Sequence, residues 1–177
     1  MHILVTGGAG FIGGHLAERF IANGHSVRAI DCLFDNYAVD IKRRTIERAR
    51  EVADETTGRY RFVEADILNR EIVDEQLAWA NVIFQSGPSG CPSERGNPFT
   101  YNEVNVNGTM NILDAAREYD VRRVVCASSS SVYGKPEYLS YDEAYPTTPI
   151  SPCGISKLAA EPYARMYYDT YSLPTVI

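Results

Sequence analysis

Short apolar runs alternate along this chain with longer segments that have the spacing of amphipathic helices. Strands that alternate with helices in this way form a parallel sheet with crossover helices on both faces. The pattern therefore predicts an α/β fold, a doubly wound parallel sheet of the Rossmann type. We expect the strands at about His2–Thr6, Ser26–Asp31, Tyr60–Ala65, Val82–Gln85, Arg123–Ala127 and from Pro174 onward.

Length and charge limit the classes of function. A chain of 177 residues that is 45% hydrophobic can bury a core, and a single globular domain is expected. The formal net charge of -6 argues against a nucleic-acid partner, because phosphate backbones require concentrated Lys and Arg. The start MHILVTGGAG lacks a charged region before a long apolar run, and no later stretch approaches a membrane span. We expect a soluble, cytoplasmic protein.

The cysteines predict neither a metal site nor a disulfide framework. Cys32, Cys91, Cys126 and Cys153 lie far apart, and none of them forms a C-x-x-C pair. Reduced thiols and no bound metal are therefore expected.

A glycine-rich stretch, TGGAGFIGGHL, directly follows the first expected strand and opens the first helix. The spacing of Gly7, Gly10 and Gly13 lets the backbone turn tightly and approach a pyrophosphate, with the helix N-terminus facing the anion. Asp31 closes the second strand, where a carboxylate can bond ribose hydroxyls and repel a 2′-phosphate. This favours NAD over NADP, although Arg28 or Lys42 could instead accommodate a phosphate.

Five motifs in order give the chain a recognisable relationship: TGGAGFIGGHL, EADI, NEVNVNGTMNILDAA, RRVVCASSSSVYG and SPCGISKLAAE. With them the chain resembles the extended short-chain dehydrogenase/reductase superfamily, in particular NAD-dependent nucleotide-sugar epimerases and dehydratases. The resemblance implies oxidation of a sugar carbon by NAD to a keto intermediate, followed by hydride return to the opposite face. It also implies a nucleotide-sugar substrate and, as is usual in that family, a homodimer formed through two long helices.

The same resemblance assigns site residues by motif position. At the adenosine and pyrophosphate end these are Gly7, Gly10, Phe11, Ile12, Gly13, Asp31, Asp66 and Ile67. At the nicotinamide and sugar end they are Asn105, Ser129 with Ser130 as the adjacent alternative, Cys153 and Lys157.

Cys153 stands where the family has its catalytic tyrosine. Lys157, one helical turn later, is placed to stabilise an ionised base and to hold the nicotinamide ribose. A thiol ionises more readily than a phenol, but it is shorter by several ångströms and general base catalysis requires a reach of roughly 3 Å. We expect an impaired catalytic site. The alternatives are a thiolate base and a non-catalytic NAD-binding module with a redox-reactive Cys153.

The epimerase and dehydratase branches differ beside the catalytic serine. Dehydratases commonly carry an acidic pair there, whereas Ser130 and Ser131 follow Ser129 in this chain. The epimerase assignment is therefore preferred.

The stretch NVIFQSGPSGCPSERGNP departs from the family pattern, with Gln85 in place of a histidine. Shifting the reading frame of one set of codons compatible with this stretch produces a family-like sequence that includes the histidine. We therefore hypothesise a compensated frameshift across roughly Gln85 to Gly96.

The last part of the chain raises two further expectations. A helix from about Ile155 to Tyr171 contains Pro162, so it should kink there or end near Glu161, with a second helix beginning at Pro162. The chain stops at LPTVI, inside an expected core strand, so residues 1–177 are expected to be a truncated NAD-binding domain without the substrate-binding part.

Overall fold

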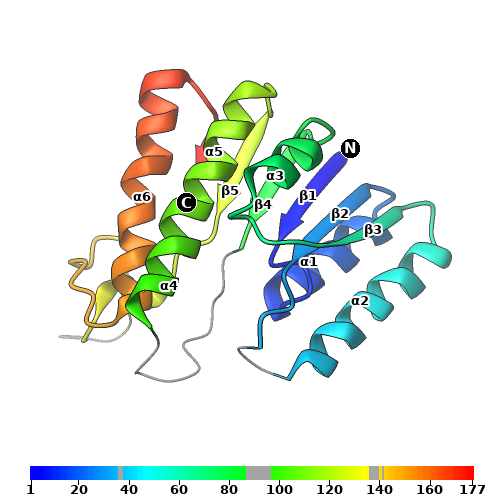
Figure 1. Ribbon diagram of the computed structural model, residues 1–177, viewed down its shortest axis with the longest axis horizontal. Helices are drawn as coiled ribbons and strands as arrows, with labels where there is room; N and C mark the ends of the chain where they lie inside the picture. Colours follow the sequence, from blue (N-terminus) through cyan, green and yellow to red (C-terminus); the bar gives the residue numbers. More distant parts are fainter. Residues whose placement is uncertain (36–37, 87–96, 136–139, 141) are drawn as a thin grey trace.

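The fold is a single six-stranded sheet in which every strand pair is parallel (Figure 1). The computed structural model describes residues 1–35, 38–86, 97–135, 140 and 142–177. The strand order is β3-β2-β1-β4-β5-β6, which confirms the Rossmann-type prediction. The strands are β1 His2–Thr6, β2 Ser26–Asp31, β3 Arg59–Glu64, β4 Val82–Gln85, β5 Arg123–Cys126 and β6 Thr175–Val176.

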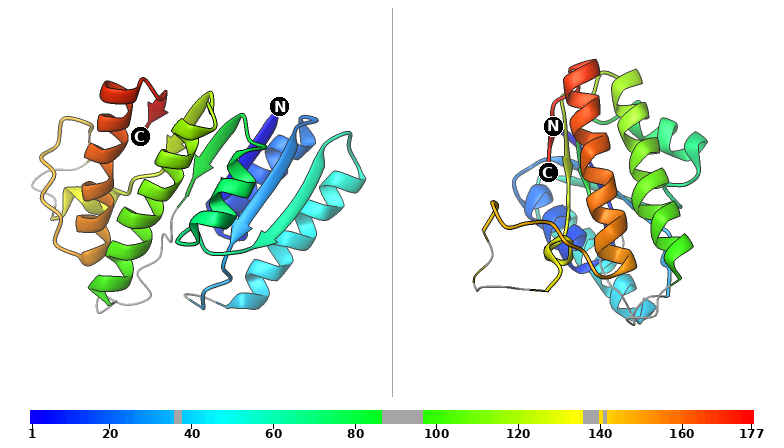
Figure 2. Two further views of the ribbon diagram at one scale, coloured as in Figure 1. Left: turned by 45° about the horizontal axis from the view of Figure 1, so that its top comes forward. Right: turned by 90° about the vertical axis from the view of Figure 1, so that its left-hand side faces the viewer.

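Helices cover both faces of the sheet (Figure 2). One face packs against α1 (Phe11–Ala22) and α2 (Val39–Asp54), and the other against α3 (Arg70–Leu77), α5 (Gly108–Glu118) and α6 (Pro152–Tyr171). A short helix α4 (Pro98–Asn102) and a π-helical turn η1 (Glu103–Asn107) lead into α5. A 3-10 turn η2 (Ser130–Tyr133) follows β5.

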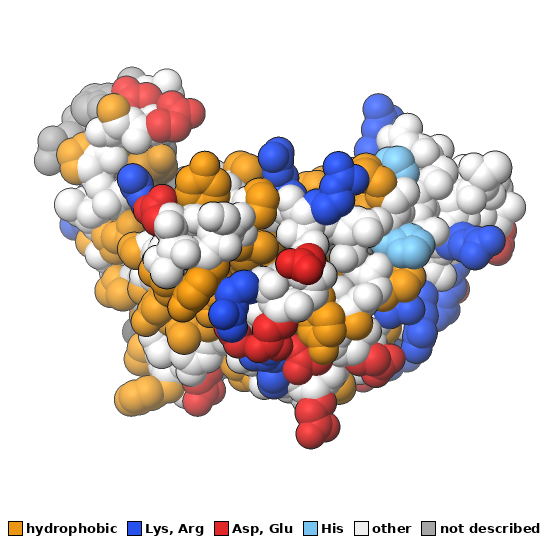
Figure 3. Space-filling model, turned by 90° about the horizontal axis from the view of Figure 1, so that it is seen from above, with side chains coloured by type: hydrophobic (Ala, Val, Ile, Leu, Met, Phe, Trp, Pro, Cys, Tyr) orange, Lys and Arg blue, Asp and Glu red, His pale blue; other side chains and the backbone are white. Residues whose placement is uncertain are grey.

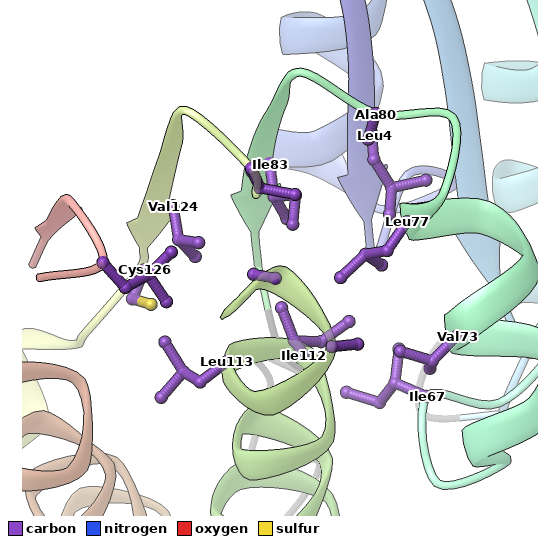
Figure 4. Packing of buried hydrophobic residues seen from close by; sticks show 14 of the residues in the cluster. Leu4, Ile67, Val73, Leu77, Ala80, Ile83, Ile112, Leu113, Val124 and Cys126 are labelled. Carbon is purple, nitrogen blue, oxygen red and sulfur yellow. The ribbon is translucent and has the colours of Figure 1, made fainter. Parts of the chain in front are cut away.

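The central strands are buried on both faces, which is why they are apolar without interruption. Alternate residues of β1 enter different cores: Leu4 joins the cluster under α3, α5 and α6, whereas Ile3 and Val5 join the cluster under α1 and α2. Figure 4 shows the larger cluster, where strand residues such as Ile83 and Val124 meet α5. Because the side chains along the strands are buried in these two clusters, the residues at the ends of the strands are the ones available to a ligand.

The expected strands match the structure to within one residue at their ends. β3 lies one residue earlier than expected and β5 ends one residue earlier. β6 begins at Thr175 because Pro174 has no N–H to give to the ladder, although its carbonyl accepts from the Val124 amide at 2.9 Å.

Helix α6 begins three residues earlier than expected. Ser151 caps it by accepting a hydrogen bond from the Gly154 amide at 3.1 Å, and Pro152 occupies the first turn, where its missing N–H is harmless. The helix continues through Pro162 as one element, so the expectation of two separate helices is wrong. The kink expected at Pro162 stays a prediction.

Figure 3 shows the face at the amino ends of the strands, where basic and acidic side chains intermingle with apolar ones. Within the described parts of the chain, no helix is long and apolar enough to cross a bilayer.

Candidate functional site

The carboxyl ends of all six strands lie along one edge of the sheet. In an open parallel sheet, ligands bind outside this edge, where the strand order reverses. Here the reversal falls between β1 and β4, the two neighbours at the centre of the strand order. The glycine loop (residues 7–13) leaves β1 at this edge, and Asp31 and Gln85 end β2 and β4.

The glycine loop has no room for a side chain at Gly7 or Gly13. Gly7 has φ of +62°, and a Cβ on it would lie 2.6 Å from the Ser86 carbonyl oxygen. A Cβ on Gly13 would lie 2.3 Å from the Gly7 carbonyl oxygen. The backbone is the only part of these residues that can meet a ligand.

The loop delivers the amino end of α1 to the edge of the sheet. Gly10 is the N-cap residue, and its amide donates to the Gly7 carbonyl at 2.9 Å. It has no side chain with which to cap the first turn. Phe11 is 78% exposed, so its side chain faces solvent, as does that of Ile12. What these two residues offer a ligand is their backbone N–H groups, which suit an anion.

Asp31 is buried beside the glycine loop with its carboxylate fixed by three donors. Its oxygens accept from the Ala9 amide at 3.2 Å, the Leu33 amide at 2.8 Å and the Lys42 ammonium at 3.2 Å. A carboxylate with an ammonium beside it therefore lies at the position predicted to bind the ribose, and that binding stays a prediction.

The two basic residues considered as phosphate ligands behave differently. Arg28 donates to the Gln76 side chain at 3.0 Å, and its guanidinium lies 4.2 Å from the centre of the Trp79 ring. It is engaged with α3 and its following turn, so that expectation is corrected. Lys42 does reach the site, where Asp31 is its partner.

Asp66 and Ile67 follow β3 at the same edge. The Asp66 carboxylate accepts from the Leu68 amide at 2.9 Å. The pKa of the Cys32 thiol is raised, first by partial burial and further by the carboxylates of Asp66 and Asp31, which both lie within electrostatic range. Ile67 is buried against Gly108, where a Cβ would lie 2.7 Å from the Ile67 Cδ1 atom.

Asn105 lies inside the π-helical turn η1 and is 0% exposed. Its Nδ2 donates to the Ser156 hydroxyl at 2.9 Å, which ties η1 to α6. Its Oδ1 is one of two buried side-chain polar atoms without a hydrogen-bond partner in the described residues. π-Helical turns are frequent at functional sites, and the assignment of Asn105 to the nicotinamide end of the site stays a prediction.

The structure brings Ser129, Cys153 and Lys157 to one place. Gly154, next to Cys153, packs so closely on η2 that a Cβ would lie 2.4 Å from the Ser131 carbonyl oxygen. The Lys157 ammonium donates to the Ala127 carbonyl at 2.9 Å. These contacts are made with Ser131 and Ala127, the residues two positions after and two positions before Ser129 in the sequence.

Hydroxyl groups at this end of the site interact with one another. Ser129 is extended, and its hydroxyl oxygen accepts from the Ser131 amide at 3.2 Å and from the Ser131 hydroxyl at 2.8 Å. Among the described residues the Ser129 hydroxyl donates to none, so its proton can be donated to a ligand. Ser130, the alternative residue, is exposed.

Burial sets the protonation chemistry of this cluster. Burial lowers the pKa of Lys157, which is 4% exposed, and the neighbouring Cys153 and Cys126 thiols act in the opposite direction. The pKa of Cys126, within the hydrophobic core, is raised to about 11 by burial. Cys153 is only 7% exposed, which leaves little room for a reagent or substrate to reach its sulfur.

Several contacts of the site were not expected from the sequence. Ser156 and Thr109 carry buried hydrogen bonds between elements, and the Ser128 hydroxyl donates to the Glu161 carboxylate. The proposed frameshift falls mostly on residues 87–96, which lie outside the described part of the chain. Of that stretch, Gln85 and Ser86 are described and are both buried.

Comparisons with known proteins identify relatives over nearly the whole chain. The family model for GDP-mannose 4,6 dehydratase matches residues 4–177. The chain is 36% identical to a UDP-glucose 4-epimerase of Mycolicibacterium smegmatis, covering 98% of this chain and 53% of that protein. It is 34% identical to a UDP-glucose 4-epimerase of Bacillus subtilis, covering 93% of this chain and 47% of that protein.

Solved structures share the fold at similar identity. A Bacillus cereus UDP-glucuronic acid 4-epimerase in complex with UDP-glucuronic acid and NAD superposes with a TM-score of 0.87 at 30% identity, covering 100% of this chain and 55% of that one. A dTDP-glucose 4,6-dehydratase of Streptomyces venezuelae with NAD bound gives 0.84 at 30% identity, covering 99% and 54%. The chain spans about half the length of the relatives it matches. The predicted resemblance to nucleotide-sugar epimerases and dehydratases is confirmed, and the chain belongs to the GDP-mannose 4,6 dehydratase family.

Proposed function

We propose that this chain binds NAD along the carboxyl edge of its sheet and forms the cofactor-binding part of a nucleotide-sugar epimerase. The observation that carries the proposal is the cradle formed by the glycine loop, where even a Cβ at Gly13 would meet the Gly7 carbonyl at 2.3 Å. A backbone shaped in this way lets a pyrophosphate approach the amino end of a helix. The Bacillus cereus and Streptomyces venezuelae relatives hold NAD, which supports the same cofactor here.

The adenosine half of the cofactor would be held by backbone groups and carboxylates. The first-turn amides of α1, including those of Phe11 and Ile12, would bind the pyrophosphate. Asp31 would accept from the ribose hydroxyls, because its carboxylate is already oriented by two backbone amides at the end of β2. Asp66 and Ile67 would border the adenine.

The nicotinamide half would lie over the Ser129, Cys153 and Lys157 cluster. NAD, when bound, supplies the acceptor for a hydride from a sugar carbon and returns that hydride. The Lys157 ammonium has three N–H groups, and one of them is used by the Ala127 carbonyl. The others would hold the nicotinamide ribose, with Asn105 near the ring and Ser129 donating to the sugar hydroxyl.

The missing element is a base that reaches the sugar. A proton must leave the sugar hydroxyl as the hydride leaves its carbon, and the base must come within roughly 3 Å. Cys153 is 7% exposed and has a short side chain, so its sulfur is poorly placed for that transfer. We expect cofactor binding to persist and epimerisation to be impaired.

An epimerase is favoured over a dehydratase by the residues after Ser129. The Ser131 hydroxyl donates to the Ser129 oxygen at 2.8 Å, in a position where dehydratases commonly carry an acidic side chain. A redox-sensing module is disfavoured by the burial of Cys153, since a sensor thiol must be accessible to its oxidant.

Calorimetry with NAD, NADH and NADPH tests the proposal. We expect NADH to bind, NADPH to bind more weakly, and UDP-glucose or UDP-galactose to show no turnover by the purified chain. Cys153→Tyr tests the base separately, because it should restore turnover only where the remainder of the family enzyme is joined to the chain. The absence of any heat from NAD or NADH at millimolar concentration would contradict the proposed function. Turnover by the unmodified chain would contradict its impairment.

A further inference from the structure

Two chains of hydrogen bonds start at Gln85 and end at neighbouring residues of α6, Ser156 and Lys157. It ends β4 in the centre of the sheet, between Thr6 of β1 and Cys126 of β5, and is 2% exposed. A buried primary amide at this position must find partners, because an unpaired one costs the free energy of its desolvation. It makes one set of contacts through its backbone and another through its side chain.

The backbone route runs through β5 to Lys157. The Ala127 amide donates to the Gln85 carbonyl at 2.9 Å. The Ala127 carbonyl in turn accepts from the Lys157 ammonium at 2.9 Å. These two hydrogen bonds fix the position of the Lys157 ammonium relative to the C-terminal end of β4.

The side-chain route runs through α5 and η1 to the same turn of α6. Gln85 Nε2 donates to the Thr109 hydroxyl at 2.8 Å, and that hydroxyl donates to the Asn105 carbonyl at 2.6 Å. The Asn105 amide nitrogen donates to the Ser156 hydroxyl at 2.9 Å. Ser156 donates to the Cys153 carbonyl at 3.0 Å and directly precedes Lys157.

The two hydroxyls make the direction of the side-chain route unambiguous. Thr109 and Ser156 each use their single proton toward a backbone carbonyl, so each can only accept from the neighbouring amide. Gln85 and Asn105 must therefore both present their NH2 groups. All four side chains are buried, which strengthens each bond and makes the loss of one costly.

We propose that Gln85 and Thr109 are positioning residues that fix the Cys153–Lys157 turn of α6 over the end of β5. The inference rests on the proposed function for its consequence, that the turn holds the nicotinamide ribose. The fixing of the Cys153–Lys157 turn by Gln85 and Thr109 does not itself depend on any cofactor. Neither residue touches the reacting atoms, and both act through Asn105 and Ser156.

The test compares two variants that break the side-chain route with a matched control. Gln85→Met removes the donor at similar volume, and Thr109→Val removes the linking hydroxyl. Thr175→Val is the control, because it also deletes one hydroxyl-to-carbonyl bond, from Thr175 to Ala164 at 3.1 Å, in the C-terminal half of α6. Melting temperatures of all three establish that each variant folds.

The first measurement is alkylation of Cys153 by iodoacetamide without cofactor, normalised by mass spectrometry to the exposed Cys32. Gln85→Met and Thr109→Val should raise the Cys153 rate about threefold to tenfold, the change in an opening equilibrium that one lost hydrogen bond produces. Thr175→Val should not. Unchanged Cys153 reactivity in both variants, or an equal rise in the control, would overturn the proposal.

The second measurement separates the two halves of the cofactor. The same two variants should weaken NADH by a similar factor and leave ADP binding unchanged, because ADP lacks the nicotinamide ribose. Equal loss of NADH and ADP would indicate general damage and overturn the positioning role. If the parent chain bound neither ligand, the proposed function would fail, whereas the alkylation result would still decide the positioning role.

Discussion

Replacing Pro162 should stabilise the protein, because the structure places it in the interior of a continuous helix. It is exposed, ten residues after the start of α6 at Pro152, and lacks the N–H that would bond the Leu158 carbonyl. Proline in a helix interior is less favourable than alanine by about 3 kcal/mol. Since Pro162 is exposed, Pro162→Ala should recover most of this difference as an increase in the free energy of unfolding. For a chain of this length the melting temperature should rise by roughly 6–12 °C.

Urea denaturation measures this prediction, with the midpoint rising and the m-value unchanged. Pro162→Gly should recover about 2 kcal/mol, because glycine restores the N–H but is about 1 kcal/mol worse than alanine. Ala159→Gly, at another exposed position of α6, is the matched control and should lose about 1 kcal/mol. If Pro162→Ala gave no gain over the parent, the helix would have to accommodate the ring without cost, and the reasoning would be refuted.

Three further predictions concern the site and its surroundings. Asp31→Ala should shift the ratio of NADPH to NADH affinity toward NADPH by about tenfold, because it removes a repulsive carboxylate and leaves the Lys42 ammonium nearby. An unchanged ratio of the two affinities in fluorescence titrations would contradict this prediction. Gly13→Ala should abolish NADH binding in the same titrations and lower the melting temperature, since its Cβ would meet the Gly7 carbonyl at 2.3 Å. Cys126→Ala should lose less stability than the parent between about pH 9 and 11. In the folded parent, burial raises the pKa of the Cys126 thiol to about 11. The contribution of this thiol to stability, on the order of 2 kcal/mol, is therefore complete below the ordinary thiol pKa and is lost as the pH rises through 11. A parent and variant with parallel urea midpoints across that range would show that Cys126 does not titrate in this way.

The parts of the site that depend on backbone geometry could be predicted from the sequence. The glycine loop is one, because the spacing of Gly7, Gly10 and Gly13 after an apolar strand leaves few other conformations. The position of Asp31 at the end of β2 follows from the length of an apolar run. Such features are set within one strand, loop and helix, and no distant contact is needed to locate them.

Arg28 shows a prediction that strand periodicity would have corrected. Successive side chains of a strand project to opposite faces, so residues three apart, such as Arg28 and Asp31, lie on different faces of the sheet. Arg28 pairs in register with Leu4 and, like it, faces the α3 side. It could not have served a ligand on the Asp31 side.

The sequence also indicated that Lys42 would be buried and paired. It lies on the buried stripe of α2 together with Ile46, Ala49 and Val52. A lysine on an otherwise apolar stripe is rarely buried unless it is paired, and the partner here is Asp31. The sequence shows that Lys42 needs a partner but not which carboxylate supplies it.

The hydrogen bonds of Thr109 and Ser156 had no such signal. Gln85 and Thr109 are 24 residues apart, and Asn105 and Ser156 are 51 apart. The Gln85–Thr109 bond depends on how α5 packs against the sheet, and the Asn105–Ser156 bond on how η1 packs against α6. Local sequence patterns do not encode this packing. Polar residues within motifs of this kind are therefore recognised by resemblance, and their partners only by structure.

Under the proposed function, binding and catalysis should be separable in this chain, because they would depend on different properties of the same turn. Lys157 is held by a backbone carbonyl and by its place in α6, and neither depends on the identity of the residue at position 153. Proton removal from a bound sugar would depend on the length of that one side chain, which ends in a buried thiol at Cys153. A substitution there removes reach without disturbing the glycine loop, Asp31 or Lys157. We therefore expect NADH affinity to be nearly the same in the parent and in Cys153→Tyr, and a large difference between them would mean that the thiol itself shapes the nicotinamide end of the site.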